Sequence, residues 1–511
     1  MPLISRTVAR LPLLAAAGLV ALAAPLVAKD TGATTEPPAD ADDAYGDAEE
    51  IVVVGGARQT GAVIGDIPPE NQLDARDIRA TGATSVAELL EAIAPQTSSA
   101  RGREGGGGPV VLLNGRRTSG FREVRDLPPE AILRVDILPE EVALKYGYRA
   151  DQRVVNIVLR QRFRSTTARA ESELATEGGR REGEIDVTRL LLGDKGRTTI
   201  NLHLEDVTPL TEAERDIAAP AAGAVDPRRF RTLLGARQLA RVGGTVNRTI
   251  FGDVSATLDG QVETSDGRSR LGPSIVNAGE ALERDSDALS GRLGVALNGD
   301  RGRWRWSMTG AYDIARNLTL TDREDAAATL LTRDRARSTN SSGALDFVAS
   351  GPLAELPAGR ASVTVKLAGD TRDIDSRSWR AAGTTAIDLG RDRLSSSLNV
   401  DLPVAKRNGA WGAIGNLTLN ANAEVEELSD FGTLATLGGG LFWSPTPKLN
   451  LIASYTREQG APGLQQLGEP TLVTPNSRIF DFSVGQTLLV DSITGGNPEL
   501  RSDTRRVSKL G

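Results

Sequence analysis

The sequence predicts a transmembrane antiparallel β-barrel that follows an N-terminal α+β domain, and three observations support this fold class. Between residues 67 and 160, signals for helices and strands alternate with short connections. After residue 165, apolar and polar residues alternate in stretches of about ten, the length of a strand that crosses a bilayer. Short turn signals recur roughly 50 residues apart, which leaves room for two such strands and one long loop between successive turns.

The first 48 residues are not expected to belong to either domain. An apolar run from residue 11 to residue 28 follows Arg6 and Arg10 and ends in small residues, the order found in a secretory signal peptide. We therefore expect residues 1–28 to be removed on export, although a single membrane anchor of minimal length has the same pattern. Residues 29–48 have too little apolar surface to fold, so we expect a disordered periplasmic linker.

A short acidic and β-branched segment follows the linker. It consists of Glu49, Glu50, Ile51, Val52, Val53, Val54 and Gly55. Branching at Cβ stiffens χ1 and favours extended backbone, so a segment of this kind can add a strand to the sheet of a partner protein. It can equally be the first strand of the domain that follows.

Residues 56–160 are predicted to form the α+β domain, which begins with a helix. Thr84 or Ser85 is expected as its N-cap, with Glu88 in the capping-box position. Apolar residues then recur at helical spacing until Pro95 ends the helix.

Strands make up the rest of this domain. A strand over residues 110–113 leads into Asn114 and Gly115, a dipeptide typical of tight turns. The glycine run at 105–108 is interpreted as a mobile loop, because it lacks the Gly-Lys-Ser/Thr of a phosphate-binding loop. Further expected elements are a helical turn at 127–132 and strands at 135–138 and 154–159.

The order of these elements resembles the plug domain of the TonB-dependent outer-membrane receptors. The features that carry the resemblance are the segment at 49–55, a Leu-Leu pair before a proline, and, in order, Asn114, Gly115, Pro129, Glu130, Tyr146, Gly147 and Asn156. The resemblance covers about residues 49–160 and implies that residues 49–55 are a TonB box. Residues 138–141 depart from the family pattern, since many members have Arg-Gly-Pro before the Tyr-Gly, which indicates a divergent subgroup.

Residues 161–511 are predicted to form the barrel, because apolar and polar residues alternate along the expected strands. In the stretch 303–314, one face carries apolar side chains and the other polar ones, namely Trp304, Trp306, Met308, Tyr312 and Ile314 against Arg303, Arg305, Ser307, Thr309 and Asp313. The stretches 253–263 and 416–426 divide in the same way. A strand with one apolar and one polar face fits a wall between lipid and water.

Turn signals divide the barrel region into pairs of strands. They lie at 193–196, 247–252, 298–302, 352–359, 406–409 and 444–448. The longer segments 205–237, 264–287 and 458–499 are expected outside the cell. A soluble β-solenoid or β-sandwich also has alternating strands. Turns in a sandwich, however, recur about every 8 to 12 residues, a much closer spacing than the roughly 50 residues between the turn signals here. Aromatic residues, at 4%, are few for the girdles of a membrane barrel, although Trp304, Trp306, Trp411, Trp443 and Tyr455 lie near expected strand ends.

The number of strands is smaller than the resemblance implies. Strand signals from residue 166 onward amount to about 14 strands, whereas barrels of the resembled family have about 22. The sequence also ends within an expected strand, and its Gly-Gly-Asn-Pro-Glu-Leu at 495–500 is similar to a loop motif that family members carry well before their end. We therefore expect a C-terminally incomplete barrel, from a fragment or a truncated gene product.

The composition excludes several classes of function. The chain has no cysteine, which excludes disulfides, thiol nucleophiles and cysteine-based metal sites. His203 is the single histidine, so paired-His metal sites are excluded, and we interpret it as a polar strand residue that faces the lumen. Asp370, Asp373 and Asp375 lack the pattern of a calcium loop and are interpreted as a solvated loop. We expect no catalytic residue, no metal and no cofactor, and the net charge of −7 argues against nucleic acid as a partner.

The resemblance implies energy-coupled uptake by a monomer embedded in the lipid of the cell outer membrane. In that mechanism a small-molecule or oligosaccharide ligand, of the siderophore, cobalamin or glycan class, binds the outer loops and the apex of the plug. The TonB complex of the inner membrane pairs with the box, and pulling rearranges the plug. The alternative is a passive outer-membrane barrel or surface adhesin without energy coupling. Lys accounts for seven of the 60 basic residues, and an Arg-rich lumen would suit anionic chelates, although coding bias explains the same excess.

Overall fold

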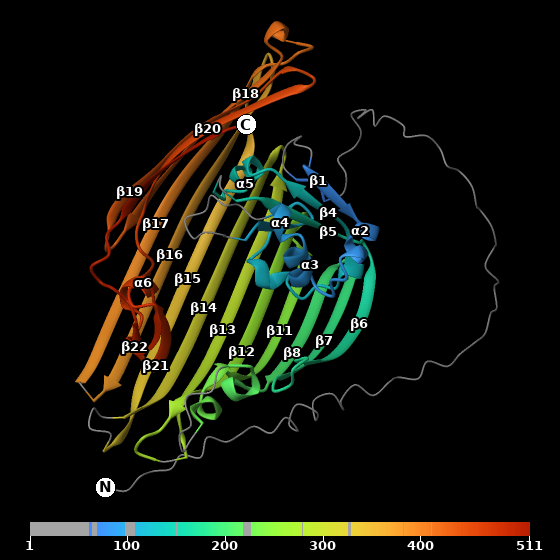
Figure 1. The fold of residues 1–511 in the computed structure, drawn as a ribbon. Helices are drawn as coiled ribbons and strands as arrows, with labels where there is room; N and C mark the ends of the chain where they lie inside the picture. Colours follow the sequence, from blue (N-terminus) through green and yellow to red (C-terminus); the bar gives the residue numbers. More distant parts are fainter. Residues whose placement is uncertain are drawn as a thin grey trace, which may run out of the picture. The chain divides into compact units, whose positions relative to one another are not determined.

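The computed structural model describes residues 61–63, 69–97, 108–149, 152–217, 226–277, 279–324, 329–381, 383–409 and 411–511. The predicted signal peptide, the linker and residues 49–55 lie outside the described residues, as does most of the glycine run. Two large sheets organise the described chain: a five-stranded sheet near its start and a wall of 14 strands (Figure 1). Within this part of the chain, no helix is both long enough and apolar enough to cross a membrane.

The five-stranded sheet is the core of the plug domain. Its strand order is β1 (Asn71–Asp74), β4 (Ile132–Leu138), β5 (Val154–Leu159), β2 (Val110–Leu113) and β3 (Arg116–Arg117). All neighbours are antiparallel except β2 and β5, which are parallel. The helices are α2 (Ala75–Ala80), α3 (Val86–Ala92), α4 (Ala94–Thr97) and α5 (Glu141–Lys145), with 3-10 turns η1 (Phe121–Glu123) and η2 (Pro129–Ala131).

Helices cover both faces of this sheet. Ile78 of α2 and the apolar residues of α3 pack on one face, and Val142 and Ala143 of α5 pack on the other. All six residues of β5 are therefore buried, which explains why its sequence is apolar without alternation. The start of the helix expected after Ser85 is confirmed, because Ser85 Oγ accepts from Glu88 N at 3.3 Å and the Glu88 carboxylate accepts from Thr84 N at 3.0 Å. Its expected end is wrong, since α3 ends at Ala92 and Pro95 lies in the first turn of α4, where proline is tolerated.

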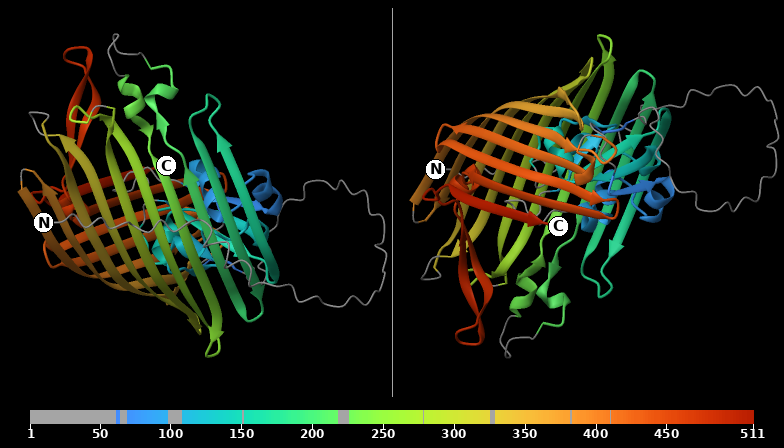
Figure 2. Two further views of the ribbon diagram at one scale, coloured as in Figure 1. Left: turned by 90° about the horizontal axis from the view of Figure 1, so that it is seen from below. Right: turned by 90° about the horizontal axis from the view of Figure 1, so that it is seen from above.

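The wall is a single antiparallel sheet in which each strand pairs with its neighbours along the chain. Its strands are β6 (Phe163–Leu174), β7 (Arg181–Gly193), β8 (Gly196–Val207), β11 (Ala236–Ile250), β12 (Val254–Pro273), β13 (Ala281–Arg301), β14 (Trp304–Glu324), β15 (Leu331–Leu356), β16 (Gly359–Arg380), β17 (Gly383–Ala405), β18 (Asn416–Leu428), β19 (Gly432–Thr446), β20 (Leu449–Gly460) and β23 (Asp503–Leu510). The expectation of about 14 strands is confirmed, and β6 and β23 stand at the two ends of the strand order. Figure 2 shows the sheet curling around the plug domain.

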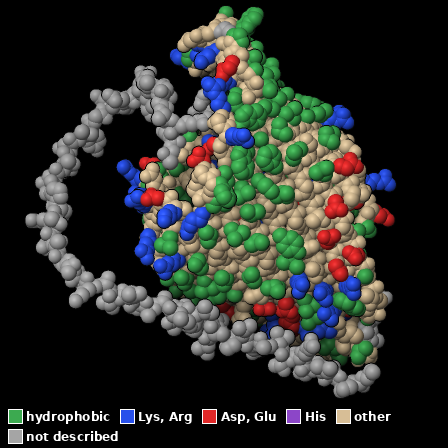
Figure 3. Space-filling model, turned by 180° about the vertical axis from the view of Figure 1, so that it is seen from behind, with side chains coloured by type: hydrophobic (Ala, Val, Ile, Leu, Met, Phe, Trp, Pro, Cys, Tyr) green, Lys and Arg blue, Asp and Glu red, His purple; other side chains and the backbone are tan. Residues whose placement is uncertain are grey.

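The burial pattern of the wall is the reverse of that in a soluble protein. Leu258 and Val262 on β12 are 54% and 58% exposed, while Thr257 and Asp259, on either side of Leu258, are each 5% exposed. On β12 the apolar side chains therefore point away from the plug and the polar ones point toward it, whereas a few apolar side chains elsewhere in the wall, such as Leu190, pack against the plug core. Figure 3 shows apolar side chains spread over the outer surface of the wall, with charged groups gathered toward its margins. The alternation predicted from the sequence is confirmed, and so is the fold class.

Most connections at one end of the wall strands are short, and the longest connections, 208–235 and 461–502, lie at the other end. Long connections contain small elements of their own: β9 (Leu210–Thr211), η3 (Glu212–Glu214), η4 (Pro227–Phe230) and β10 (Thr232–Leu234) in one, and α6 (Leu464–Gly468), β21 (Leu472–Asp481) and β22 (Gln486–Thr494) in another. One of the short connections holds η5 (Gly412–Ile414).

Three expectations about the wall are wrong. The strands are not limited to about ten residues: β15 has 26, and the expected loop at 264–287 is mostly the paired ends of β12 and β13. Beyond the length that a bilayer covers, both faces of a hairpin meet water, so the alternation that marks a strand disappears while the backbone pairing continues. For the same reason Asp370, Asp373 and Asp375 lie in β16 rather than in a loop.

Candidate functional site: the interface between plug and wall

Several residues that the sequence singled out meet around one tight turn between β2 and β3. Asn114 and Gly115 both have positive φ, 51° and 70°, as a two-residue hairpin turn requires. Asn156 Oδ1 accepts from Gly115 N at 2.8 Å, and the Tyr146 hydroxyl donates to Gly115 O at 2.8 Å. Four of the seven predicted plug residues thus form one hydrogen-bonded group.

The remaining three lie elsewhere. Pro129 and Glu130 are in η2, where Glu130 O accepts from Arg160 Nε at 2.8 Å. Gly147 has a φ of 71° and follows Tyr146 at the point where the plug approaches the wall. A Cβ at this position would lie 2.7 Å from Val348 Cγ2, so a larger residue would push the plug away from β15.

The short described segment 61–63 connects to the same turn. Asn156 Nδ2 donates to Gly61 O at 2.9 Å and to Asp136 Oδ2 at 3.1 Å, which completes the bonding of a side chain with no exposed surface. A Cβ on Gly115 would lie 2.4 Å from Ala62 O, so the segment passes directly over the turn. Residues 49–55 precede this segment and lie outside the described residues, so their role as a TonB box stays a prediction.

Replacing Asn156 by alanine will destabilise the plug by about 3 kcal/mol, because three buried polar groups around it lose their partner. Hydrogen–deuterium exchange of β2 and β5 measures this loss as a lower free energy of local opening. Asn71→Ala is the matched control: this asparagine is exposed, and its removal should change stability by less than about 0.5 kcal/mol. Equal protection in both variants would contradict the structural role assigned to Asn156.

Residues 116–126, here called the docking segment, carry a series of polar contacts to the wall. Their partners come from β8, β12, β13, β14 and β15. The contacts are Arg116 to Asn298 O (3.1 Å), Arg117 to Asp346 (3.1 Å), Ser119 Oγ to Asp259, Arg122 to Asp313 (3.8 Å), Glu123 to Arg197 (2.6 Å), Arg125 to Gln261 (3.1 Å) and Asp126 to Asn201 (2.6 Å). The inner face of the wall therefore holds the plug mainly through hydrogen bonds and ion pairs.

The pair of Glu123 and Arg197 is the most deeply buried of these contacts. Their side chains are 3% and 4% exposed, and Arg197 Nη2 donates to Glu123 Oε1 at 2.6 Å. Burial raises the pKa of Glu123, while Arg197 and the hydrogen bonds from Ser119 act in the opposite direction. Two further nitrogens of Arg197 have no acceptor within the described chain, so Glu123 is the group that neutralises this guanidinium.

Replacing Glu123 by leucine will weaken docking of the plug by about 3–5 kcal/mol, because the guanidinium of Arg197 stays buried without its counter-charge. Hydrogen exchange in the docking segment is the measurement. The double variant Glu123→Leu with Arg197→Met should recover most of the loss, since two apolar side chains replace both charges. A double variant as weak as the single one would show that the ion pair is not the cause.

Contacts outside the docking segment attach both edges of the plug. Arg169 on β6 donates to Glu88 at 2.9 Å and to Thr84 at 2.6 Å, and Lys145 of α5 pairs with Asp401 at 3.3 Å. Burial alone would raise the pKa of Glu88, but the hydrogen bonds from Thr84 and Arg169 outweigh it and lower that pKa. The plug is thus fixed to strands far apart in the wall.

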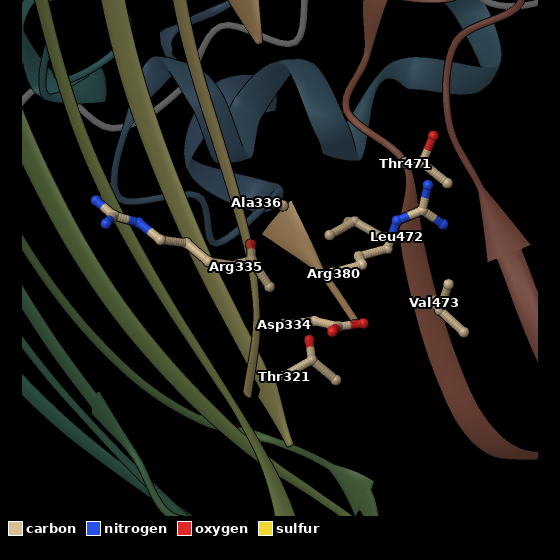
Figure 4. A pocket seen from close by; sticks show the side chains of 9 residues that line it. Thr321, Asp334, Arg335, Ala336, Arg380, Thr471, Leu472 and Val473 are labelled. Carbon is tan, nitrogen blue, oxygen red and sulfur yellow. The ribbon is translucent and has the colours of Figure 1, made fainter. Parts of the chain in front are cut away.

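The long connection that contains α6 packs against the inner face of the wall. Leu464 and Leu467 bury themselves against Ile374, and Ser376 Oγ donates to Gly468 O at 2.7 Å. A cavity of about 10 Å³ lies between this connection and β14, β15 and β16, and Figure 4 shows its lining. It is lined by Thr319, Thr321, Asp334, Arg335, Ala336, Arg380, Thr471, Leu472 and Val473. This volume suits one water molecule rather than a ligand.

The sequence did not reveal the docking segment. Residues 116–126 contain no strong periodic pattern, and their partners are distant in sequence, for example 74 residues between Glu123 and Arg197. Local cues were present only as a cluster of charged residues after a tight turn, a pattern that solvated loops share.

Comparison with known proteins identifies the fold. No protein-family model matches the sequence, and no curated protein matches it. The siderophore receptor PirA from Acinetobacter baumannii is 14% identical, with a TM-score of 0.53 over 86% of this chain and 67% of its own. PirA from Pseudomonas aeruginosa is 16% identical, with a TM-score of 0.51 over 86% and 70%.

The ferric enterobactin receptor PfeA from Pseudomonas aeruginosa, in complex with BCV-L6, is 13% identical, with a TM-score of 0.54 over 86% of this chain and 69% of its own. The chain spans about two thirds of the length of these receptors. It has the plug-and-barrel fold of TonB-dependent siderophore receptors, the fold that the sequence resemblance predicts.

Proposed function

We propose that this chain is an outer-membrane receptor that takes up a scarce ligand by energy-coupled rearrangement of its plug. The TonB complex of the inner membrane supplies the coupling through residues 49–55, and lipid of the outer membrane surrounds the wall. The apolar outer face of the wall supports a position within a lipid membrane, because exposed side chains such as Leu258 and Val262 would otherwise face water.

The observation that carries this proposal is the path from residues 49–55 to the plug. Gly55 is six positions before Gly61, a reach of at most about 20 Å in extended chain. Within the described residues, the first contacts after the box are the bond between Gly61 and Asn156 and the packing of Val63 in the plug core, so a force applied at the box would act on them. Beyond Asn156 lies the turn at Gly115, whose carbonyl accepts from Arg305 of the wall at 3.2 Å.

The chemistry of the interface supports a plug that moves. Hydrogen bonds and ion pairs such as Arg117 with Asp346 can exchange for contacts with water when the two surfaces separate. Separation of a large apolar interface would instead expose apolar surface to water, which costs free energy in proportion to the area exposed. The contacts that the docking segment makes with the wall are hydrogen bonds and ion pairs, so their release costs less than the opening of a hydrophobic core.

The neighbours support one ligand class as the first to test. PirA is a siderophore receptor and PfeA a ferric enterobactin receptor, so ferric siderophores are the first class to test, followed by cobalamin and glycans.

Cells that express the chain will accumulate the radiolabelled ligand only while energised. Binding to the cell surface should persist after an uncoupler is added, because binding needs no energy, whereas accumulation should stop. A panel of iron chelates, cobalamin and oligosaccharides identifies the ligand. Cell fractionation determines whether the protein is in the outer membrane. Accumulation that continues in uncoupled cells would favour a passive barrel instead.

A further inference from the structure

The single histidine of the chain lies among carboxylates on the inner face of the wall. His203 on β8 is the cross-strand partner of Asp186 on β7, and Glu184 is the partner of Glu205 in the same ladder. Residues two apart on a strand project from the same face, so all four side chains share one patch. Among the described residues, Glu184, Asp186 and His203 are the one group of three or more such side chains whose ligand atoms converge, all within 4.8 Å of one another.

The distances in this cluster match those between ligands of a metal ion. His203 Nδ1 lies 2.8 Å from Asp186 Oδ1 and 3.5 Å from Glu184 Oε1. Metal bonds of about 2.1 Å place neighbouring ligand atoms about 3.0 Å apart in octahedral geometry and about 3.4 Å apart in tetrahedral geometry. One ion can therefore reach all three atoms after small side-chain adjustments.

A second, independent observation is the environment of the other ring nitrogen. His203 Nε2 lies 3.9 Å from Glu205 Oε2, so the two groups must approach by about 1 Å to form a hydrogen bond, and Arg237 Nε donates to Glu205 Oε1 at 3.0 Å. A histidine that binds a metal commonly directs its second nitrogen to a carboxylate, which fixes the orientation of the ring. Glu205 is suited to that role because its side chain is only 10% exposed and Arg237 holds it.

The charge balance of the cluster is compatible with a bound cation. Arg169, the cross-strand partner of Asp186, directs its guanidinium to Thr84, Glu88 and Glu171 instead. No lysine or arginine of the described chain forms an ion pair with Glu184 or Asp186. Two carboxylates thus share one imidazole in a partly buried patch, and close carboxylates repel unless a proton or a metal ion lies between them.

We propose that Glu184, Asp186 and His203 bind one divalent transition-metal ion, with Glu205 as the positioning residue for the imidazole. One imidazole nitrogen and two carboxylate oxygens are ligands that Zn²⁺ accepts, and the remaining coordination positions are left to water or another ligand. The site is independent of the proposed transport function, since it requires neither residues 49–55 nor movement of the plug. It replaces the sequence-based interpretation of His203 as an ordinary polar strand residue.

Isothermal titration of the purified, tag-free full chain with ZnCl₂ tests the site. We expect one Zn²⁺ per chain, with affinity at least 10-fold weaker in His203→Ala and in Asp186→Asn. Glu205→Gln should weaken binding by about 10-fold or more, as removal of an orienting carboxylate does. Glu182→Gln is the matched control, because Glu182 lies on the same strand and the same face but outside the cluster.

A spectroscopic measurement separates this site from adventitious binding to other carboxylates. Because the chain has one histidine and no cysteine, nitrogen coupling in the electron paramagnetic resonance spectrum of bound Cu²⁺ would come from His203. That coupling should be present in the parent and in Glu182→Gln and absent in His203→Ala. Circular dichroism confirms folding, and Asp186→Asn keeps the packing if the alanine variant unfolds. Absence of Zn²⁺ binding by the folded parent, or equal binding by all variants, would overturn the proposal.

Discussion

Deletion of residues 49–55 will abolish ligand accumulation and leave binding at the cell surface unchanged. The expected loss is complete, because these residues are the acidic and β-branched segment that the TonB complex would hold. Binding should persist because the outer loops, the docking segment and the wall remain intact. Uptake of labelled ligand into energised cells, with surface binding measured in uncoupled cells, separates the two steps.

The matched control is deletion of residues 34–40, which removes the same number of residues from the predicted linker and keeps residues 49–55. A disordered linker tolerates a change in length at small cost, so this variant should transport at close to the parent rate. Equal loss in both deletions would show that chain length, rather than the acidic and β-branched segment, limits uptake. Unchanged uptake after deletion of 49–55 would refute coupling through this segment.

The wall could be predicted from the sequence because its physics is local. Where one face meets lipid and the other meets polar groups, as at Leu258 and Asp259, the environment imposes a period of two that single residues report. Where both faces of a strand meet water, as in the outer part of β12, the environment imposes no period of two on the sequence. The sequence therefore predicts a loop where the structure has a strand. Short helices could not be predicted for a related reason. The five residues of α5, for example, are too few to show a helical period.

The candidate site was only half predictable. Asn114 and Gly115 identify a turn by themselves, because the dipeptide suits the positive φ that the turn requires. Asn156 attaches to that turn across 41 positions, and its role depends on which strands become neighbours in the five-stranded sheet. The cluster at His203 depends in the same way on the register of β7 and β8, which places Asp186 opposite the imidazole. Sequence spacing alone contains neither pairing.

A disulfide between plug and wall will stop accumulation without affecting binding, provided that the plug must leave the wall during transport. Ser119 of the docking segment donates a hydrogen bond to Asp259 of β12, so the two side chains are adjacent. The variant Ser119→Cys with Asp259→Cys can therefore form a bridge at modest distortion. The chain has no cysteine of its own, so no other thiol competes. Oxidised protein should lose uptake, and dithiothreitol should restore it to the level of the single variants.

A second cysteine pair separates locking of the plug from general effects of oxidation. Ser350 and Thr364 are cross-strand partners on β15 and β16, with hydroxyl oxygens 3.0 Å apart, and both belong to the wall. A bridge between cysteines at these positions joins two strands that are already paired, so uptake should be equal before and after reduction. Because Asp259, Ser350 and Thr364 are all buried on the inner face of the wall, a difference between the two bridges reports on movement between plug and wall. If the locked variant at Ser119 and Asp259 accumulates ligand as well as its reduced form, transport proceeds with the docking segment in place, and the path for the ligand must lie elsewhere along the wall.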